Sequence, residues 1–262
     1  MTIILVEEVS ISFGEVRVLE GVSFSVRPGE TLCILGGSGG GKSTLLRALM
    51  GVLRPSSGRV VIDGQDTSGM GERGWKSLRR SFGVTFQGGA LFNSMSIAEN
   101  VALPLEIHTK LDAETIATMV KIKLHQVDLF HAADRRPGEI SGGMQKRAAI
   151  ARALALDPKI LFYDEPSAGL DPIATTRVDQ LITQLKETMG MTNIVVTHVM
   201  ESVRRIADHV IMLDEGRVIL DGTLDDLLGS QDPRIRQFLT GDLEGPQAGA
   251  DDPGEYYRDL LM

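Results

Sequence analysis

The chain has 262 residues, of which 42% are hydrophobic and 24% charged, and its formal net charge at pH 7 is −8. This composition is that of an ordinary globular protein, and the length allows one large domain or a core with a subdomain. Because there is no run near the ~18 apolar residues of a membrane span, no signal-peptide pattern at the N-terminus and a single cysteine, Cys33, we expect an intracellular protein without disulfides.

The negative charge is concentrated at the C-terminus. Residues 241–262 hold six acidic residues and one basic residue, a net −5, which leaves −3 for the rest of the chain. A nearly neutral body with an acidic tail argues against a nucleic-acid partner, since nucleic-acid-binding domains carry a basic face. We therefore expect no nucleic acid to bind.

The first 88 residues are predicted to contain five strands and one helix, from their apolar alternation and turn signals. The strands are residues 3–13, 16–26, 31–35, 59–62 and 82–86, and the helix is residues 44–50. The first two strands should pair antiparallel around Gly14-Glu15. The glycine-rich residues 69–74 are predicted to form a loop, followed by Trp75 as a packing residue.

The segment between the third strand and the first helix reads GGSGGGKS, which is the G-x-x-x-x-G-K-[ST] pattern in the strand–loop–helix context of a phosphate loop. Its glycines let backbone N–H groups surround phosphate oxygens, and the helix N-terminus adds partial positive charge. Lys42 is expected to reach the β- and γ-phosphates and Ser43 to ligate Mg²⁺. The expected ATP-binding residues of this loop are Gly36, Gly37, Ser38, Gly39, Gly40, Gly41, Lys42, Ser43 and Thr44.

Residues 89–157 have a helical pattern. Apolar positions recur at helical spacing from Ile116 to Val127, Asp112 is placed to cap that helix, and another helix is predicted after Ser141. We interpret this region as a helical subdomain inserted into an α/β core made of residues 1–88 and 158–240. Residues 241–262 are interpreted as an acidic linker and tail.

Strands and helices alternate again after residue 158, which indicates a parallel sheet. The strands are predicted at residues 159–163, 193–197, 210–213 and 217–220, and the helices at 172–189, after His198, at 224–228 and at 233–239. Asp171 is the expected N-cap of the long helix. The predicted buried face of that helix is Ile173, Val178, Leu181, Ile182, Leu185 and Met189.

Two carboxylates, Asp164 and Glu165, follow the first of these strands. Asp164 is expected to hold Mg²⁺ through water, and Glu165 to polarise the water that attacks the γ-phosphate. Ser141-Gly142-Gly143, at a helix start, is a second anion cradle of the same physical kind as the phosphate loop. One γ-phosphate hardly needs two cradles from one subunit, so we predict that a second copy of the chain supplies this one across a two-fold interface.

Together these motifs resemble those of the ATP-binding-cassette (ABC) ATPase subunits, over about residues 3–240. The resemblance implies an α/β, ABC-type P-loop NTPase fold with a RecA-like core, an antiparallel β subdomain and an inserted helical subdomain. It implies that Phe13 stacks on adenine and that Gln87 contacts Mg²⁺ and takes part in catalysis with Glu165. It also implies that Asp171 belongs to the ATP site and that His198 contacts the γ-phosphate. Met144 departs from the glutamine usual in the family's signature motif, which could weaken a contact across the dimer.

A narrower resemblance is to the Mla phospholipid-transport branch of the family, carried by residues 86–96, 99–105, 141–144 and 163–173. It implies a peripheral ATPase at the cytoplasmic face of the bacterial inner membrane. Its partners would be an integral-membrane permease, a periplasmic lipid-binding protein and a small cytoplasmic STAS-domain protein. Leu91 and Phe92, beside Gln87, would offer the permease a docking surface; alternatively, both belong to the subdomain core.

Two other functions fit the same motifs. An ABC importer ATPase for a polar solute such as an amino acid would share every catalytic residue. A non-transport ABC ATPase acting on DNA or ribosomes would call for a coiled-coil insertion, zinc-spaced cysteines or two cassettes, and this sequence has none of them. In the tail, Tyr256, Tyr257, Leu260 and Leu261 form either an anchor for the neighbouring subunit or an unstructured terminus.

Overall fold

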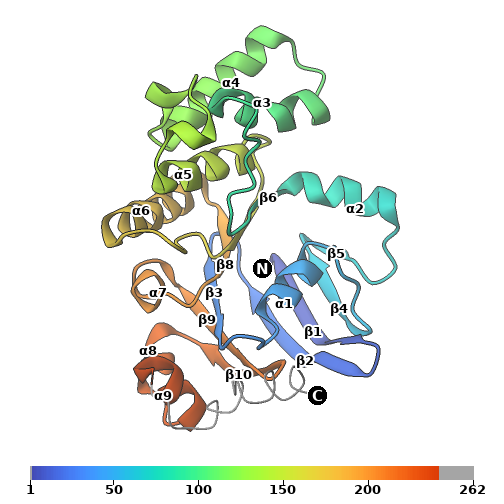
Figure 1. The fold of residues 1–262 in the computed structure, drawn as a ribbon. Helices are drawn as coiled ribbons and strands as arrows, with labels where there is room; N and C mark the ends of the chain where they lie inside the picture. Colours follow the sequence, from blue (N-terminus) through green and yellow to red (C-terminus); the bar gives the residue numbers. More distant parts are fainter. Residues whose placement is uncertain (1, 242–262) are drawn as a thin grey trace, which may run out of the picture.

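The computed structural model describes residues 2–241, which form two β-sheets and their connecting helices, with the smaller sheet at one side of the molecule (Figure 1). The larger sheet has the strand order β10-β9-β3-β8-β7-β6, and the smaller has the order β2-β1-β4-β5. The strands of the larger sheet are β3 (Thr31–Gly36), β6 (Phe82–Thr85), β7 (Ile160–Asp164), β8 (Thr192–Val196), β9 (His209–Asp214) and β10 (Arg217–Gly222). The hypothesis of a tail anchor concerns residues outside those described.

The larger sheet is parallel except at one edge, where β10 runs antiparallel to β9. Both faces of its central strands are buried, so side chains alternate between two apolar clusters. Leu32 and Ile34 of β3 belong to one cluster, whereas Cys33 and Leu35 belong to the other. This two-sided burial explains why these strands read as continuous apolar runs.

The smaller sheet is antiparallel and packs against one of the two clusters. Its strands are β1 (Ile4–Phe13), β2 (Val16–Val26), β4 (Ser57–Ile62) and β5 (Gln65–Asp66). The predicted pairing of the first two strands is confirmed, with Phe13 opposite Val16 at the turn. Asp63 and Gly64, with φ of 48° and 75°, form the turn between β4 and β5, where glycine and aspartate tolerate the left-handed backbone.

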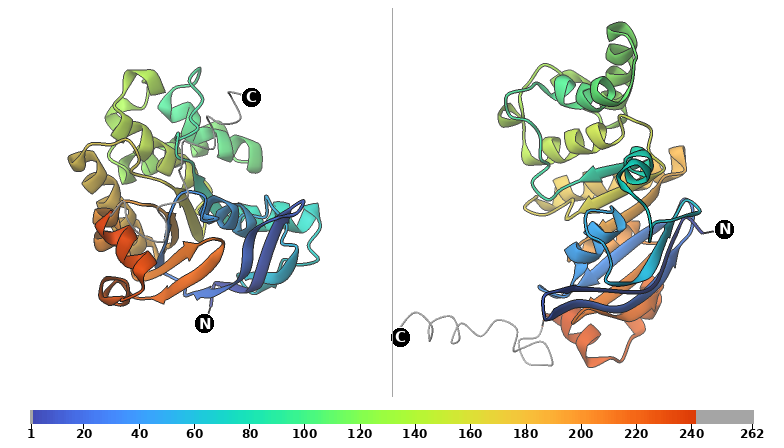
Figure 2. Two further views of the ribbon diagram at one scale, coloured as in Figure 1. Left: turned by 60° about the horizontal axis from the view of Figure 1, so that its bottom comes forward. Right: turned by 90° about the vertical axis from the view of Figure 1, so that its right-hand side faces the viewer.

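The helical region lies at one end of the molecule, and α8 and α9 lie at the other (Figures 1 and 2). Its elements are α3 (Ile97–His108), α4 (Ala113–Gln126), the 3₁₀ turns η2 (Phe130–Ala132) and η3 (Pro137–Glu139), and α5 (Gly142–Ala153). Asp112 caps α4 by accepting a backbone N–H bond, as predicted, and Ser141 caps α5 in the same way at the predicted start of that helix. The exact subdomain boundaries at residues 89 and 157 stay a prediction.

The remaining helices flank the larger sheet or close the chain. They are α1 (Lys42–Leu49), α2 (Glu72–Leu78) with η1 (Arg79–Ser81), α6 (Pro172–Met189), α7 (Met200–Ile206), α8 (Leu224–Gly229) and α9 (Pro233–Thr240). Asp171 caps α6, and Gly190, with φ 64°, ends it, as predicted. Between residues 2 and 241, no helix is both long and apolar enough to cross a membrane.

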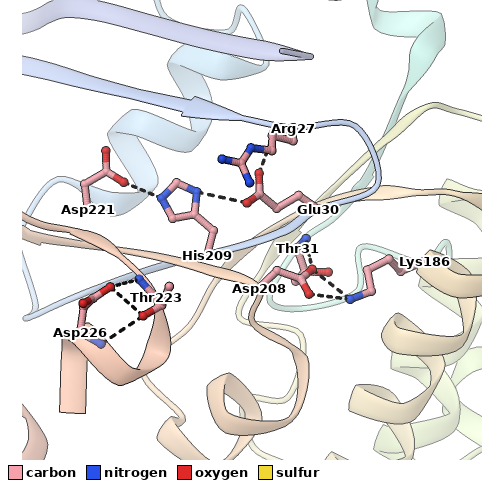
Figure 3. A network of polar contacts seen from close by, with 9 residues as sticks. All are labelled: Arg27, Glu30, Thr31, Lys186, Asp208, His209, Asp221, Thr223 and Asp226. Carbon is pink, nitrogen blue, oxygen red and sulfur yellow. Dashed lines mark hydrogen bonds and ion pairs between the residues drawn. The ribbon is translucent and has the colours of Figure 1, made fainter. Parts of the chain in front are cut away.

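A polar network fixes the amino-terminal edge of the larger sheet (Figure 3). The Asp208 carboxylate accepts the backbone N–H of Thr31 at 2.8 Å and the ammonium of Lys186 at 2.9 Å, which joins β3 to α6. His209 lies between Asp221 of β10 and Glu30, which precedes β3. These contacts set the register of neighbouring strands at the edge opposite the predicted chemistry.

Two local predictions are wrong. The loop expected at residues 69–74 gives way at Glu72 to α2, which buries Trp75 and Leu78. A Cβ on Gly51 would lie 2.3 Å from the Trp75 ring, so it is tertiary packing that holds this glycine-containing helix. Ile173 is 71% exposed rather than buried. It precedes Val178 by five residues, an offset of about 140° around a helix, and so lies off the apolar face.

Candidate ATP site

Four of the sequence motifs meet at the carboxyl-terminal edge of the larger sheet. The phosphate loop follows β3, Gln87 follows β6, Asp164 and Glu165 end β7, and His198 follows β8. These strands are parallel neighbours, so their carboxyl ends lie side by side, at the edge where open α/β sheets bind ligands. The sheet topology therefore brings these predicted site residues together at one edge.

The phosphate loop closely approaches β9. Gly36 has φ 142°, and a Cβ at this position would lie 2.1 Å from the carbonyl oxygen of Leu213. Gly41, with φ 96°, precedes α1 and would bring a Cβ to 2.6 Å from the Leu19 side chain. Glycine is needed at both positions, so the loop can keep its backbone N–H groups around an anion while its ends are packed against β2 and β9.

The cost of filling this space is testable. We expect Gly36→Ala to lower the free energy of unfolding by about 2–4 kcal/mol, since the new methyl group collides with backbone as well as meeting an unfavourable φ. Gly39→Ala is the matched control because Gly39 also has a positive φ, 74°, but has no atom within 4 Å of a Cβ. It should cost only about 1–2 kcal/mol. Equal losses in urea unfolding would contradict the steric explanation.

Lys42 points into the phosphate loop. Its ammonium donates to the carbonyl oxygens of Gly36 at 2.8 Å and Gly37 at 2.6 Å. Burial lowers the pKa of Lys42, while the nearby carboxylates of Glu165 and Asp164 act in the opposite direction. An anion in the loop would give this half-buried cation a charged partner in place of backbone carbonyls.

The two carboxylates differ in their surroundings. Burial and the neighbouring charge of Glu165 raise the pKa of Asp164, against the opposing effects of Arg47, Lys146 and Lys42. Glu165 has one carboxylate oxygen 2.8 Å from Nδ1 of His198, and its other oxygen is buried with no partner among the described residues. An orphaned buried carboxylate oxygen is what a general base would present to a water molecule.

Two further expected site residues, Gln87 after β6 and Phe13 in the smaller sheet, are exposed. Phe13, at the end of β1, is 52% exposed, which leaves a ring face free for stacking. The Gln87 side chain points to solvent, and its backbone carbonyl is bonded by Lys146. Ser38 and Ser43 are also exposed. These side chains are available to a ligand rather than used in packing.

Ser141, Gly142 and Gly143, which match the family's signature motif at the start of α5 (the signature helix), do not follow any of these strands. Ser141, Gly143 and Asp171 line a separate cavity of about 460 Å³, which no residue of the phosphate loop lines. Gly142 and Gly143 let α5 approach the segment around Asp171: added Cβ atoms would lie 3.4 Å from Leu170 and 3.1 Å from Ala174. In one copy of the chain, the phosphate loop and the segment at Ser141 therefore do not share a cavity.

Sequence reasoning missed three polar side chains of the helical region that bind this edge. Lys146 and Arg152 of α5 donate to backbone carbonyls of residues 87–90, and buried Asn100 of α3 bonds the backbone of Phe92. Lysine and arginine in a helix usually face water, so their residue types alone gave no signal. The small Ala149 between them, on a helix expected to pack, was the available hint.

Residues 19–168, more than half of the chain, match the family profile described as ABC transporter. The chain belongs to the ABC transporter family.

Relatives extend the match to nearly its full length. The intermembrane phospholipid transport system ATP-binding protein MlaF of Haemophilus influenzae is 40% identical over 98% of both chains. MlaF of Escherichia coli K12 is 39% identical over 97% of this chain and 94% of its own. The probable ribonucleotide transport ATP-binding protein mkl of Mycobacterium tuberculosis is 43% identical over 90% of this chain and 66% of its own.

Solved ABC structures have the same fold. CbiO1 of Clostridium perfringens, part of the transporter complex cbiONQ, has a TM-score of 0.82 and 33% identity, over 91% of this chain and 95% of its own. The cassette MJ0796, a dimer bound to ADP and Pi, has a TM-score of 0.76 and 32% identity, over 84% of this chain and 98% of its own. The expected ABC-type P-loop fold is confirmed, and this ABC cassette is an ATPase that couples hydrolysis to transport.

Proposed function

We propose that this ABC cassette hydrolyses Mg-ATP in a head-to-tail homodimer to move phospholipids for a transporter of the bacterial inner membrane. The observation that carries the lipid assignment is the 40% identity to a phospholipid-transport ATPase over 98% of both chains. The peripheral position at the cytoplasmic face follows from a membrane permease that the ATPase must drive.

Another cargo is possible for such a cassette, and one relative bears a different name. The mycobacterial protein named for ribonucleotide transport is slightly more similar per residue, yet this chain covers only 66% of it. The match to MlaF runs almost end to end in both proteins, which favours a shared subunit architecture. A polar-solute transporter is therefore the second candidate.

Within the site, we assign roles from position. Lys42 and the loop amides bind the phosphates, and Phe13 stacks on the base. The hydroxyl of Ser43, the carboxylate of Asp164 and the amide of Gln87 form a set of hard oxygen donors, which suits Mg²⁺. When bound, Mg²⁺ would neutralise charge on the phosphates. Glu165 accepts the proton of the attacking water, and His198 holds Glu165 through the 2.8 Å contact.

The dimer is supported by the separation of the two cradles. The cavity lined by Ser141, Gly143 and Asp171 receives the γ-phosphate of ATP held by the phosphate loop of the partner. Isologous pairing then forms two equal sites. MJ0796, which shares this fold, is a dimer with ADP and Pi bound.

Exposed aromatic residues beside Gln87 support permease docking. Phe86 and Phe92 are 48% and 51% exposed, whereas Leu91 packs against the core. The proposed docking surface therefore keeps Phe92 of the expected Leu91–Phe92 pair, leaves out Leu91 and adds Phe86. A short helix of a membrane subunit would bury these rings next to a residue of the ATP site.

The assignment is tested by purifying the full-length protein from membranes with its native partners. Mass spectrometry should identify a permease and a periplasmic lipid-binding protein, a small STAS-domain protein, and bound phospholipid. Phe86→Ser with Phe92→Ser should reduce recovery of the permease severalfold, because an aromatic anchor is lost. A solute permease without phospholipid would overturn the lipid assignment and leave the ATPase assignment intact.

A further inference from the structure

We propose that Lys146 and Arg152 of α5 are positioning residues that clamp the Gln87 segment (residues 86–92) to the signature helix, so that the helix and the segment move together. The inference rests on the proposed role of Ser141 in binding ATP of the partner. What it adds is a connection: α5 begins at the signature and binds the segment that carries Gln87 and the proposed docking rings.

Lys146 joins three parts of the site. Its ammonium donates to the backbone carbonyl of Gln87 and, at 3.3 Å, to the backbone carbonyl of Glu165. It forms no ion pair with any residue between 2 and 241, although Glu165 and Asp164 are close enough to counter the lowering of its pKa by burial. One side chain of the signature helix thus holds the ends of both β6 and β7.

Arg152 holds the next part of the segment. Its guanidinium donates in a fork to the carbonyl oxygens of Gly89 at 2.9 Å and Ala90 at 2.7 Å. Burial lowers its pKa, and within the described chain no carboxylate pairs with it. A fixed fork of this kind defines the position and the orientation of the backbone it binds.

The space between the two cations is shaped for this contact. Ala149 lies three residues after Lys146 and three before Arg152, so the three form a row along the helix. A Cβ on Gly89 would lie 3.8 Å from Ala149 and 3.9 Å from the carbonyl oxygen of Gln145. The chain at Gly89 therefore packs directly on the surface of α5, between the two long side chains.

The clamp also binds backbone that is unfavourable on its own. Glu165 and Ala90 have φ of 49° and 50°, in the left-handed region that residues with a side chain avoid. Their carbonyl oxygens are acceptors of Lys146 and Arg152, respectively. Charge-assisted bonds to these two carbonyls help to maintain conformations that place Glu165 and Gln87 at the site.

At the far end of the segment, Asn100 completes its attachment to the helical region. Fully buried, it accepts the N–H of Phe92 at 2.8 Å and donates to the Phe92 carbonyl at 3.1 Å. The segment is thus bound to α3 and α5 at both ends through its backbone. If Ser141 is displaced when the dimer closes, Gln87 should therefore move with it. This coupling runs through the backbone of residues 86–92 and does not depend on their side chains.

Hydrogen exchange of the full-length, nucleotide-free chain tests the clamp without ATP, lipid or a partner. We expect Lys146→Met and Arg152→Met each to speed amide exchange in residues 86–92 by about tenfold or more, with little change in residues 36–50. Lys146→Arg should restore protection. Lys121→Met, at an exposed site on α4, is the control and should change nothing. Wild-type exchange in residues 86–92 of both methionine variants would overturn the proposal.

ATP turnover tests whether the clamp acts through Gln87. Lys146→Met should lower kcat about tenfold with little change in KM, and this loss should largely vanish in a Gln87→Ala background, as expected for residues that act as a unit. Losses that simply multiply would contradict positioning of Gln87. If Lys146→Met unfolds, Lys146→Ala, which also removes the donor to the Gln87 and Glu165 carbonyls, replaces it under the same criteria. Because the exchange test needs no turnover, failure of the clamp and failure of the proposed function give different results.

Discussion

The Glu165→Gln protein is expected to bind Mg-ATP as the unchanged chain does and to hydrolyse it about 10²–10⁴ times more slowly, the range attributed to a general base. Glutamine keeps the shape of the side chain and a hydrogen bond toward His198, which lies 2.8 Å away in the present structure. It cannot take a proton from water at neutral pH. Since ATP is then bound but not consumed, the closed dimer should accumulate.

The measurement combines steady-state phosphate release with size-exclusion chromatography in Mg-ATP. Glu187→Gln is the matched control because Glu187 is an exposed glutamate of α6. Glu187→Gln should hydrolyse ATP at the wild-type rate, and its elution profile in Mg-ATP should match that of the wild-type protein. Phosphate release by Glu165→Gln at the wild-type rate would refute the assignment of Glu165, and a loss of nucleotide binding would show a structural role instead.

Most of the fold was accessible from the sequence because local signals and tertiary packing agree. Strands buried on both faces read as apolar runs, and Asp112, Ser141 and Asp171 occupy cap positions that their side chains fill. The sequence predicted a loop where the structure has α2, because packing outweighs the low helix propensity of Gly74 there. The Trp75 ring fits the surface that Gly51 leaves open, and this contact stabilises the helix.

Some residues of the candidate site could be predicted from the sequence, and others could not. Residues that need a special backbone or a strand end, such as Gly36 and Glu165, are visible as motifs. Residues that act through backbone carbonyls of distant segments are not, because a carbonyl acceptor leaves no trace in residue type. Lys146 and Arg152 donate to backbone carbonyls about 60 residues away in sequence, and the spacing of residue types in the sequence does not predict these hydrogen bonds.

Ser141→Asp is expected to abolish ATP-driven dimer closure and to lower turnover at least about 100-fold, because a negative charge would occupy the cradle meant for the γ-phosphate of the partner. The substitution is designed to preserve the helix. The Ser141 hydroxyl accepts the N–H of Met144 as the N-cap of α5, and aspartate caps equally well. Ser141→Asn has nearly the same size and capping ability without the charge, so it should retain most of the turnover. Equal turnover of Ser141→Asp and Ser141→Asn would contradict the proposal that this cradle binds the γ-phosphate.

Mixing two inactive proteins then decides whether the cradle serves its own chain or a second copy. Lys42→Ala lacks a working phosphate loop but keeps Ser141, whereas Ser141→Asp lacks the cradle but keeps Lys42. In a head-to-tail dimer of the two, one site receives both defects and the other receives neither. Random association makes about half of the dimers mixed, each with one complete site of two, so about a quarter of wild-type turnover should return if the sites work independently. A cradle that served its own chain would leave every site in the mixture defective, and the mixture would stay as inactive as its components.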